Sequence, residues 1–79
     1  MNHSLKSIVM ATMMKELKTY YSDDVPTDED LQEGIRIART QDCLVSIVWA
    51  VYHSSYRVLI QPTDSLSNIK DKMPKVYGL

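Results

Sequence analysis

Few side chains in this sequence can carry out chemistry near neutral pH. The chain has two histidines, His3 and His53, and a single cysteine, Cys43. Cys43 and His53 fall on one face of a predicted strand, which suggests a thiol nucleophile with its base. Along a strand, however, they lie roughly 33 Å apart, since each residue adds about 3.3 Å. We therefore interpret Cys43 as a small, buried apolar side chain.

The sequence contains none of the common catalytic or cofactor motifs. His53 precedes Ser54 and Ser55, but neither a glycine-rich elbow nor the third group of a catalytic triad accompanies them. The chain has two glycines, too few for a glycine-rich phosphate loop, and no zinc-ligand spacing. The sequence predicts no catalytic residue, no metal and no cofactor, and hence a protein that is not an enzyme.

One segment carries charge of a single sign. Negative charge at the start of a helix interacts favourably with the helix dipole, which gives the segment a purely structural explanation. An EF-hand calcium loop does not fit, because the glycine at its bend is missing. In a second interpretation, Asp28, Glu29 and Asp30 form an acidic patch that docks on a basic partner. The acidic residues of the segment are Asp23, Asp24, Asp28, Glu29, Asp30 and Glu33.

Basic side chains offer a different kind of site. Lys70, Lys72 and Lys75 form a modest basic patch, which is too small for strong DNA binding. If arginines of a neighbouring subunit lay beside them, the cluster could hold a small anionic ligand such as a nucleotide. The candidate residues for this ligand site are Arg36, Arg39, Arg57, Lys70 and Lys72.

The N-terminal region allows three interpretations. Apolar residues between Leu5 and Leu17 recur at three- and four-residue spacing, which predicts an amphipathic helix. The short run Lys6 to Thr12 is also compatible with a strand. Because several methionines could be start residues, residues 1–13 could instead be a flexible or non-native extension.

A second helix has clear boundaries. A break from Ser22 to Pro26 precedes Thr27, a good N-cap, and Asp30 occupies the capping-box position. The helix is expected to end near Gln41 or Asp42. Gly34 lies beside its apolar face and permits a close approach to a neighbouring element. That face consists of Leu31, Ile35 and Ala38.

Two strands are predicted next, from Cys43 to Tyr52 and from Tyr56 to Gln61, joined at Ser54–Ser55. That turn would pair Trp49 with Ile60, Val51 with Val58 and His53 with Tyr56. The predicted core face is Cys43, Val45, Ile47, Trp49, Val51 and His53. A last helix, capped by Thr63 or Asp64, presents Leu66, Ile69 and Met73 before Pro74 ends it.

These elements predict one α+β domain over residues 1–79, in the order α-α-β-β-α. An isolated two-stranded hairpin is only marginally stable. Because the first strand is apolar on both faces, we expect a second copy to complete the sheet, edge to edge or face to face. The chain is therefore predicted to be a homodimer or a higher homo-oligomer.

Composition limits the partners. The formal net charge of -1 and the hydrophobic share of 44 % describe an ordinary globular chain, for which nucleic acid is an unlikely partner. No membrane span or signal peptide is expected, and a lone cysteine is typical of the cytoplasm. Tyr52, Arg57 and Leu59 on the second sheet face combine residue types that are common in protein interfaces.

The leading hypothesis is a non-enzymatic, oligomeric interaction module that binds and occludes a macromolecular partner. In size and mild acidity the chain resembles the small accessory proteins that phages and mobile elements encode to inhibit host machinery. The alternative is a protein that binds or sequesters a small anionic ligand between subunits. A third, weaker alternative is a helix-turn-helix-like regulator, although the expected second helix begins with acidic residues and is followed by strands.

Overall fold

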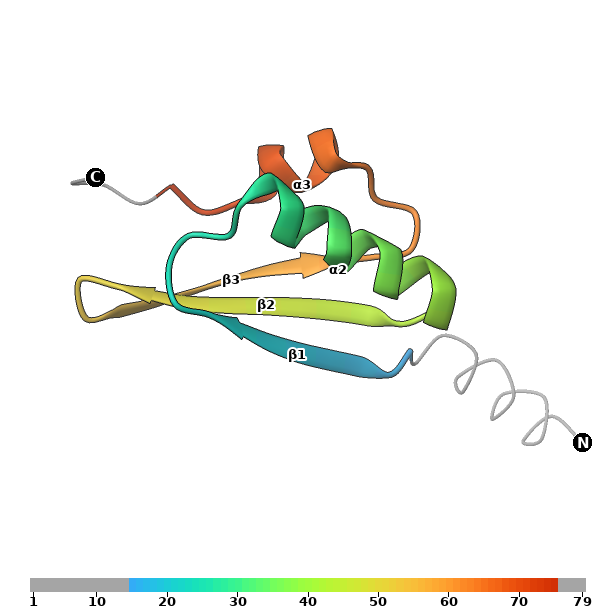
Figure 1. Cartoon of the computed structure of the whole chain (residues 1–79), viewed down its shortest axis with the longest axis horizontal. Helices are drawn as coiled ribbons and strands as arrows, with labels where there is room; N and C mark the ends of the chain where they lie inside the picture. The colour runs from blue at the N-terminus through green and yellow to red at the C-terminus, as the bar shows by residue number, and fades with distance from the viewer. Residues whose placement is uncertain (1–14, 76–79) are drawn as a thin grey trace, which may run out of the picture.

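A long central strand, β2 (Leu44–Val51), organises the fold in the computed structural model, which describes residues 15–75. β1 (Leu17–Ser22) pairs with β2 in parallel, and β3 (Ser54–Ile60) pairs with its other side in antiparallel orientation. The helices α2 (Asp28–Gln41) and α3 (Leu66–Lys72) complete the domain (Figure 1). The predicted α+β class is confirmed, but the predicted order is wrong, because the described order is β-α-β-β-α.

β1 is the element that sequence analysis missed. The expected N-terminal helix extended to Leu17, but Leu17 begins a strand whose register runs from Leu17 opposite Leu44 to Ser22 opposite Trp49. Thr19, Tyr20 and Tyr21 are β-branched or aromatic and favour a strand. The three interpretations for residues 1–13 lie outside the described residues.

α2 confirms the capping box and the apolar face that the sequence predicted. Thr27 caps it: its hydroxyl accepts from Asp30 N, and the Asp30 carboxylate accepts from Thr27 N, the capping box that was predicted. The predicted apolar face of Leu31, Ile35 and Ala38 is buried. A Cβ at Gly34 would lie 2.6 Å from Ile60 Cδ1, so this glycine allows the helix to approach the sheet closely.

The hairpin turn is displaced from its predicted place. Tyr52 and His53 form a two-residue loop, with φ angles of 52° and 65°, and Val51 lies opposite Ser54. Positive φ at both positions is characteristic of a type I′ turn, whose hand matches the twist of the strands. The predicted turn at Ser54–Ser55 and its three cross-strand pairs are therefore wrong. His53 lies in the turn and not on the core face.

The corrected register still places the predicted strand residues in the core. Trp49 lies opposite Tyr56, and their rings stack with centroids 6.0 Å apart. The predicted and observed turns differ in position by two residues. Because this difference is even, the β3 residues expected on the core face still share that face with their β2 partners. The buried apolar residues of the strands are Val45, Ile47, Trp49, Val58 and Ile60, and Cys43, just before β2, is buried with them.

α3 closes the same layer. Its N-cap is Ser65, and not the predicted Thr63 or Asp64, and its side chain Ile69 is fully buried. Asp64 has a different role, since its carboxylate accepts from Gln61 N and from Lys72 Nζ, each at 2.8 Å. Arg39 of α2 donates to the carbonyls of Pro62 and Asp64 and so ties this loop to the first helix.

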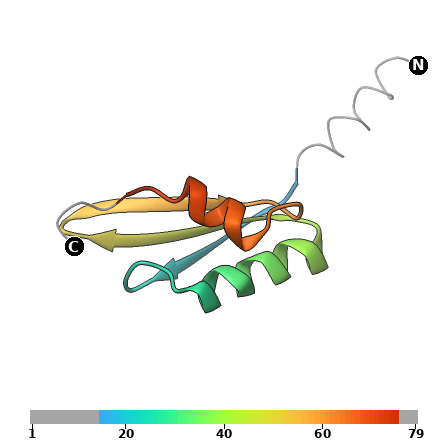
Figure 2. The same cartoon turned by 90° about the horizontal axis from the view of Figure 1, so that it is seen from above.

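Both described helices lie on one face of the sheet, where α3 contacts α2 and β3 (Figures 1 and 2). On the opposite face, no helix of residues 15–75 is packed. The described helices are also too short and too polar to cross a membrane.

Candidate functional site: the uncovered sheet face and the edge of β1

The uncovered side of the sheet, which we call the open face, is formed by alternate residues of all three strands. Cross-strand partners in the observed register share a face, so the parallel and antiparallel pairings together define its members. The open face consists of Leu17, Thr19 and Tyr21 of β1, Leu44, Ser46, Val48 and Ala50 of β2, and Ser55, Arg57 and Leu59 of β3.

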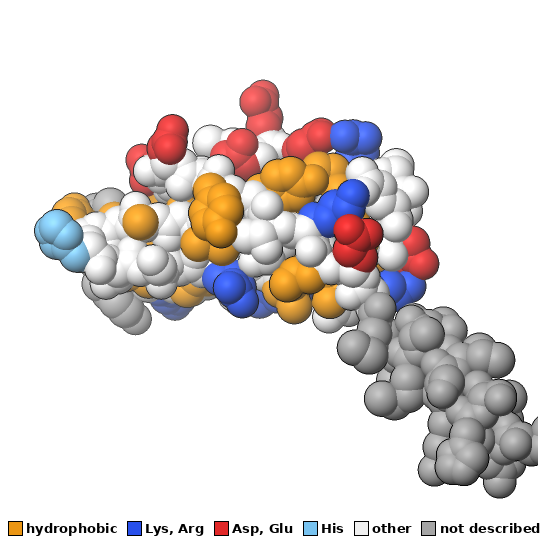
Figure 3. All heavy atoms as spheres, turned by 90° about the horizontal axis from the view of Figure 1, so that it is seen from below, with side chains coloured by type: hydrophobic (Ala, Val, Ile, Leu, Met, Phe, Trp, Pro, Cys, Tyr) orange, Lys and Arg blue, Asp and Glu red, His pale blue; other side chains and the backbone are white. Residues whose placement is uncertain are grey.

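Large apolar side chains on this face are accessible. Tyr21 exposes 82 % of its surface, Leu17 49 % and Leu59 37 %, whereas core residues of the other face expose almost none. In the view from below, hydrophobic side chains lie among charged groups, which are mostly acidic along the upper margin and mostly basic along the lower one (Figure 3). An exposed apolar surface with a polar rim is typical of a binding site.

One cross-sheet row combines the residue types that dominate binding energies. Tyr21 pairs with Val48, and Val48 pairs with Arg57, so a tyrosine and an arginine flank an aliphatic centre. Tyrosine and arginine are enriched among interface hot spots. Among the described residues, Arg57 has no ion-pair partner, and it is the only charged side chain of the open face.

β1 also presents a bare backbone edge. Leu44 N donates to Glu16 O at 2.9 Å, which directs the backbone polar groups of Glu16 toward β2. Because these groups alternate along a strand, those of Lys18 and Tyr20 also face β2, and those of Leu17, Thr19 and Tyr21 face outward. No strand within residues 15–75 pairs with this outer edge. It is therefore available to an added strand.

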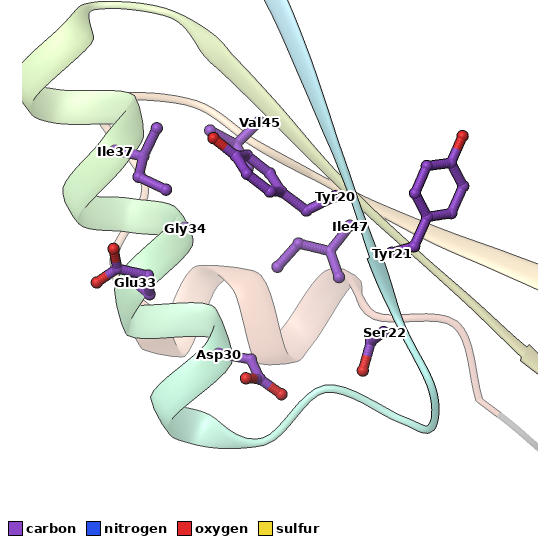
Figure 4. Close-up of a pocket in the computed structure, with 9 residues that line it drawn as sticks. All are labelled: Tyr20, Tyr21, Ser22, Asp30, Glu33, Gly34, Ile37, Val45 and Ile47. Atoms are coloured by element: carbon purple, nitrogen blue, oxygen red, sulfur yellow. The ribbon is translucent and has the colours of Figure 1, made fainter.

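A groove of about 300 Å³ runs along the helix side of β1. Tyr20 points toward α2, and Tyr21, the next residue, points away from it (Figure 4). Aliphatic side chains and Gly34 line the groove, with Asp30 and Glu33 on α2. A strand added to β1 would therefore meet side chains on both faces of the sheet. The apolar lining residues other than Tyr20 and Tyr21 are Ile37, Val45 and Ile47.

The acidic segment is largely engaged within the chain. Asp28 pairs with Lys70 at 3.3 Å, and Asp30 belongs to the capping box. A hydrogen bond from Arg36, with the attraction of its charge, holds the pKa of Glu33 below its ordinary value. Glu29, by contrast, is exposed and has no ion pair in the described part of the chain.

The candidate ligand-binding residues do not converge within one chain. Arg36 pairs with Glu33, Lys70 with Asp28 and Lys72 with Asp64, and Arg39 donates to loop carbonyls. Arg57 lies on the opposite face of the sheet from the helices that carry the other four.

The structure brings together only some residues of the predicted partner surface. Arg57 and Leu59 lie on the open face as expected, but Tyr52 lies in the turn, where it exposes 65 % of its surface. Sequence analysis missed Leu17, Thr19 and Tyr21. The alternation of these three residues was a usable signal, but the predicted helix ended at Leu17, and the residues that follow it were assigned to no strand.

The described residues offer little reactive chemistry. Cys43 is a buried free thiol, as predicted, and His53 lies in an exposed turn. No cluster of three or more histidine, cysteine, aspartate or glutamate side chains suitable for a metal occurs in residues 15–75. Comparison with protein families, with curated proteins and with solved structures found no match for this chain.

Proposed function

We propose that this protein is a non-enzymatic interaction module that binds a protein partner on its open face and occludes the surface it covers. The observation that carries this proposal is the contrast between the two faces of one sheet. Two helices cover one face, whereas the other exposes Leu17, Tyr21 and Leu59 around the half-buried Leu44 and Val48 of β2. Burying such a surface against a partner is favourable by about 25 cal/mol per Å² of apolar area.

The open face defines the chemistry of its partner. A complementary surface must be apolar at its centre, opposite Val48, and must accept the phenol edge of Tyr21. Arg57 requires a carboxylate, because a guanidinium buried without a charged partner is strongly unfavourable. The expected partner is thus a protein with an apolar patch that carries one aspartate or glutamate at its margin.

Two observations favour this surface over the acidic helix start. Asp28 and Glu33 already pair with Lys70 and Arg36, so part of the negative charge of this segment is engaged within the chain. In addition, surface ion pairs are worth at most about 1 kcal/mol each, whereas aromatic and arginine anchors contribute about 2 kcal/mol or more. The homo-oligomer predicted from the sequence belongs to the same proposal, since a second copy can enlarge the binding surface.

Site-specific photo-crosslinking in the producing cell tests this function. A photoreactive phenylalanine analogue is placed at Tyr21 or Leu59 on the open face, and at Gln32 or Glu29 on the exposed side of α2. We expect positions 21 and 59 to form crosslinks to the same peptide of one protein. The substitution Arg57→Glu should abolish those crosslinks, because it repels the expected carboxylate.

The control positions make the result decisive. Gln32 and Glu29 are exposed but lie on the helix layer, so they report contacts that do not involve the open face. Equal crosslinking from all four positions, or crosslinking from Glu29 alone, would refute the open face as the binding surface. Circular dichroism of each variant checks that the fold is retained.

A further inference from the structure

The outer edge of β1 is unpaired within the described part of the chain. Its outward groups come from Leu17, Thr19 and Tyr21, a set that is symmetric about Thr19. We propose that a second copy of this chain pairs antiparallel along β1, with Thr19 opposite Thr19 of the second copy. The pairing joins two three-stranded sheets into one of six strands. It extends the proposed function and rests on it, because the pairing joins two open faces into one larger binding surface.

The backbone pattern restricts the register. In an antiparallel pair, the residues that exchange two hydrogen bonds lie directly opposite each other. Only Leu17, Thr19 and Tyr21 direct these groups outward, so each must lie opposite one of the same three residues of the second copy. With Thr19 at the centre, Leu17 lies opposite Tyr21 and all outward groups of the strand are used.

Charge selects this register over its neighbours. The nearest registers that keep this backbone pattern slide one strand by two residues. They place Lys18 opposite Lys18, or else Glu16 opposite Asp24, and like charges directly opposite each other are unfavourable. The proposed register places no like charges opposite each other, and it sets Lys15, which also pairs with Asp42 of its own chain at 2.8 Å, opposite Asp23. It also sets Lys18 of the second copy opposite Tyr20, on the side where Asp30 and Glu33 line the groove.

The other edge of the sheet does not offer this complementarity. On β3 the ladder to β2 uses Ser54, Tyr56, Val58 and Ile60, so the outward groups are centred on Arg57. An antiparallel pair of β3 strands would set Arg57 opposite Arg57. A charge at the middle of an edge strand is a common protection against such pairing.

The size of the open face supports the same arrangement. Strands of 6, 8 and 7 residues, about 4.8 Å apart and rising about 3.3 Å per residue, cover roughly 330 Å² in projection. A stable interface buries about 800 Å² on each partner. A single copy is therefore too small to present a standard interface. Two copies joined at β1 present about twice the area, with Leu17 and Tyr21 of both copies at its centre.

Disulfide formation between engineered cysteines measures the register. Thr19→Cys, Lys18→Cys and Tyr20→Cys are prepared as separate variants of the full chain and oxidised mildly. Directly opposite residues lie about 5.5 Å apart between Cα atoms, within reach of a disulfide, and diagonal ones about 7–8 Å apart, beyond it. We expect a covalent dimer from Thr19→Cys alone. A dimer from either neighbour, or from none of the three, would overturn the proposal.

The native chain supplies one control and proline supplies another. Cys43 is buried, so the unmodified protein should give no covalent dimer. Thr19→Pro removes an outward N–H without breaking the ladder to β2, and should reduce the mass in light scattering from twice the chain mass of 9.1 kDa to that of one chain. Thr19→Val should leave the mass unchanged. A dimer that survives Thr19→Pro would contradict β1 pairing.

These measurements separate the two proposals. Self-pairing is tested on the purified chain without any partner, and partner binding is tested by crosslinks from Tyr21 and Leu59 to another protein. A chain that pairs through β1 but gives no partner crosslinks would refute the proposed function alone. A monomeric chain with open-face crosslinks would refute the edge pairing alone.

Discussion

The two faces of the sheet carry neighbouring residues in opposite situations. Ile60 is fully buried beneath the helices, whereas Leu59, one residue earlier in β3, remains 37 % exposed on the open face. Local sequence is similar on both sides, since each face of β2 is rich in aliphatic residues. Within residues 15–75, the helices cover one face and leave the other without a cover. We infer that stability resides mainly in the covered face and binding in the open one.

The largest expected effect is the difference in stability between substitutions of Ile60 and Leu59. Ile60→Ala removes a fully buried side chain and should lower the free energy of unfolding by about 2–5 kcal/mol. Leu59→Ala should cost less than about 1 kcal/mol, because its side chain already contacts water. Urea denaturation of both variants measures the difference. Equal losses would mean that the open face is also part of the folding core.

A smaller effect probes how closely α2 approaches the sheet. Gly34→Val places a branched side chain where even a Cβ would lie 2.6 Å from Ile60 Cδ1, and should cost about 1–3 kcal/mol. Gly34→Ala is the matched control, since the gain in helix propensity of about 1 kcal/mol offsets part of its overlap. If Gly34→Val unfolds at the same temperature as the unchanged protein, α2 lies farther from the strands than the structure shows.

The turn decides which residues reach each face, and it can be tested at two positions. His53→Gly should stabilise the protein by about 0.5–1 kcal/mol, because glycine adopts the positive φ of this turn without strain. Ser55→Gly should destabilise it by a similar amount, because Ser55 lies within β3. The opposite result, in which His53→Gly destabilises the protein and Ser55→Gly stabilises it, would place the turn at Ser54–Ser55.

The smallest effect concerns the loop before α3 and depends on pH. Burial acts to raise the pKa of Asp64, but hydrogen bonds from Lys72 and Gln61 N, with the charge of Lys72, outweigh it and lower that pKa below 3.8. The stabilisation is therefore complete above the ordinary pKa and is lost as pH falls through the lowered one. It should amount to less than about 1 kcal/mol.

Asp64→Asn should remove this part of the acid dependence of unfolding, which lies below the ordinary pKa of an aspartate, about 4. Asp71→Asn is the control, as Asp71 is exposed and has no ion pair in the described part of the chain. Identical acid titrations of wild type and Asp64→Asn would mean that the contacts with Lys72 and Gln61 do not persist in solution.

The features predicted correctly depend on local interactions. The capping box of Thr27 and Asp30 lies within four residues, and alternation along β2 reveals a buried face even when the register is wrong. β1 was missed because its pairing with β2 joins segments separated by α2, and short apolar runs do not distinguish a strand from a helix. The turn was misplaced because Tyr52–His53 lacks the asparagine and glycine that mark type I′ turns.

The residues of the open face also differ in whether local sequence or long-range strand pairing reveals them. Arg57 and Leu59 were predicted because they alternate with core residues in a recognisable strand. Tyr21 and Leu17 could not be assigned to that surface until β1 was known to extend the sheet. The opposite situations of Tyr20 and Tyr21 result from strand alternation, which a helical interpretation obscures.

Amide hydrogen exchange along β1 tests most directly whether another chain completes this side of the molecule. Lys18 and Tyr20 donate toward β2 and should be protected at every protein concentration, so they serve as internal controls. We predict that Leu17, Thr19 and Tyr21 are protected at high concentration and lose that protection on dilution, as a second copy leaves the edge. Rapid exchange of these three amides at every concentration, beside protected Lys18 and Tyr20, would contradict the account.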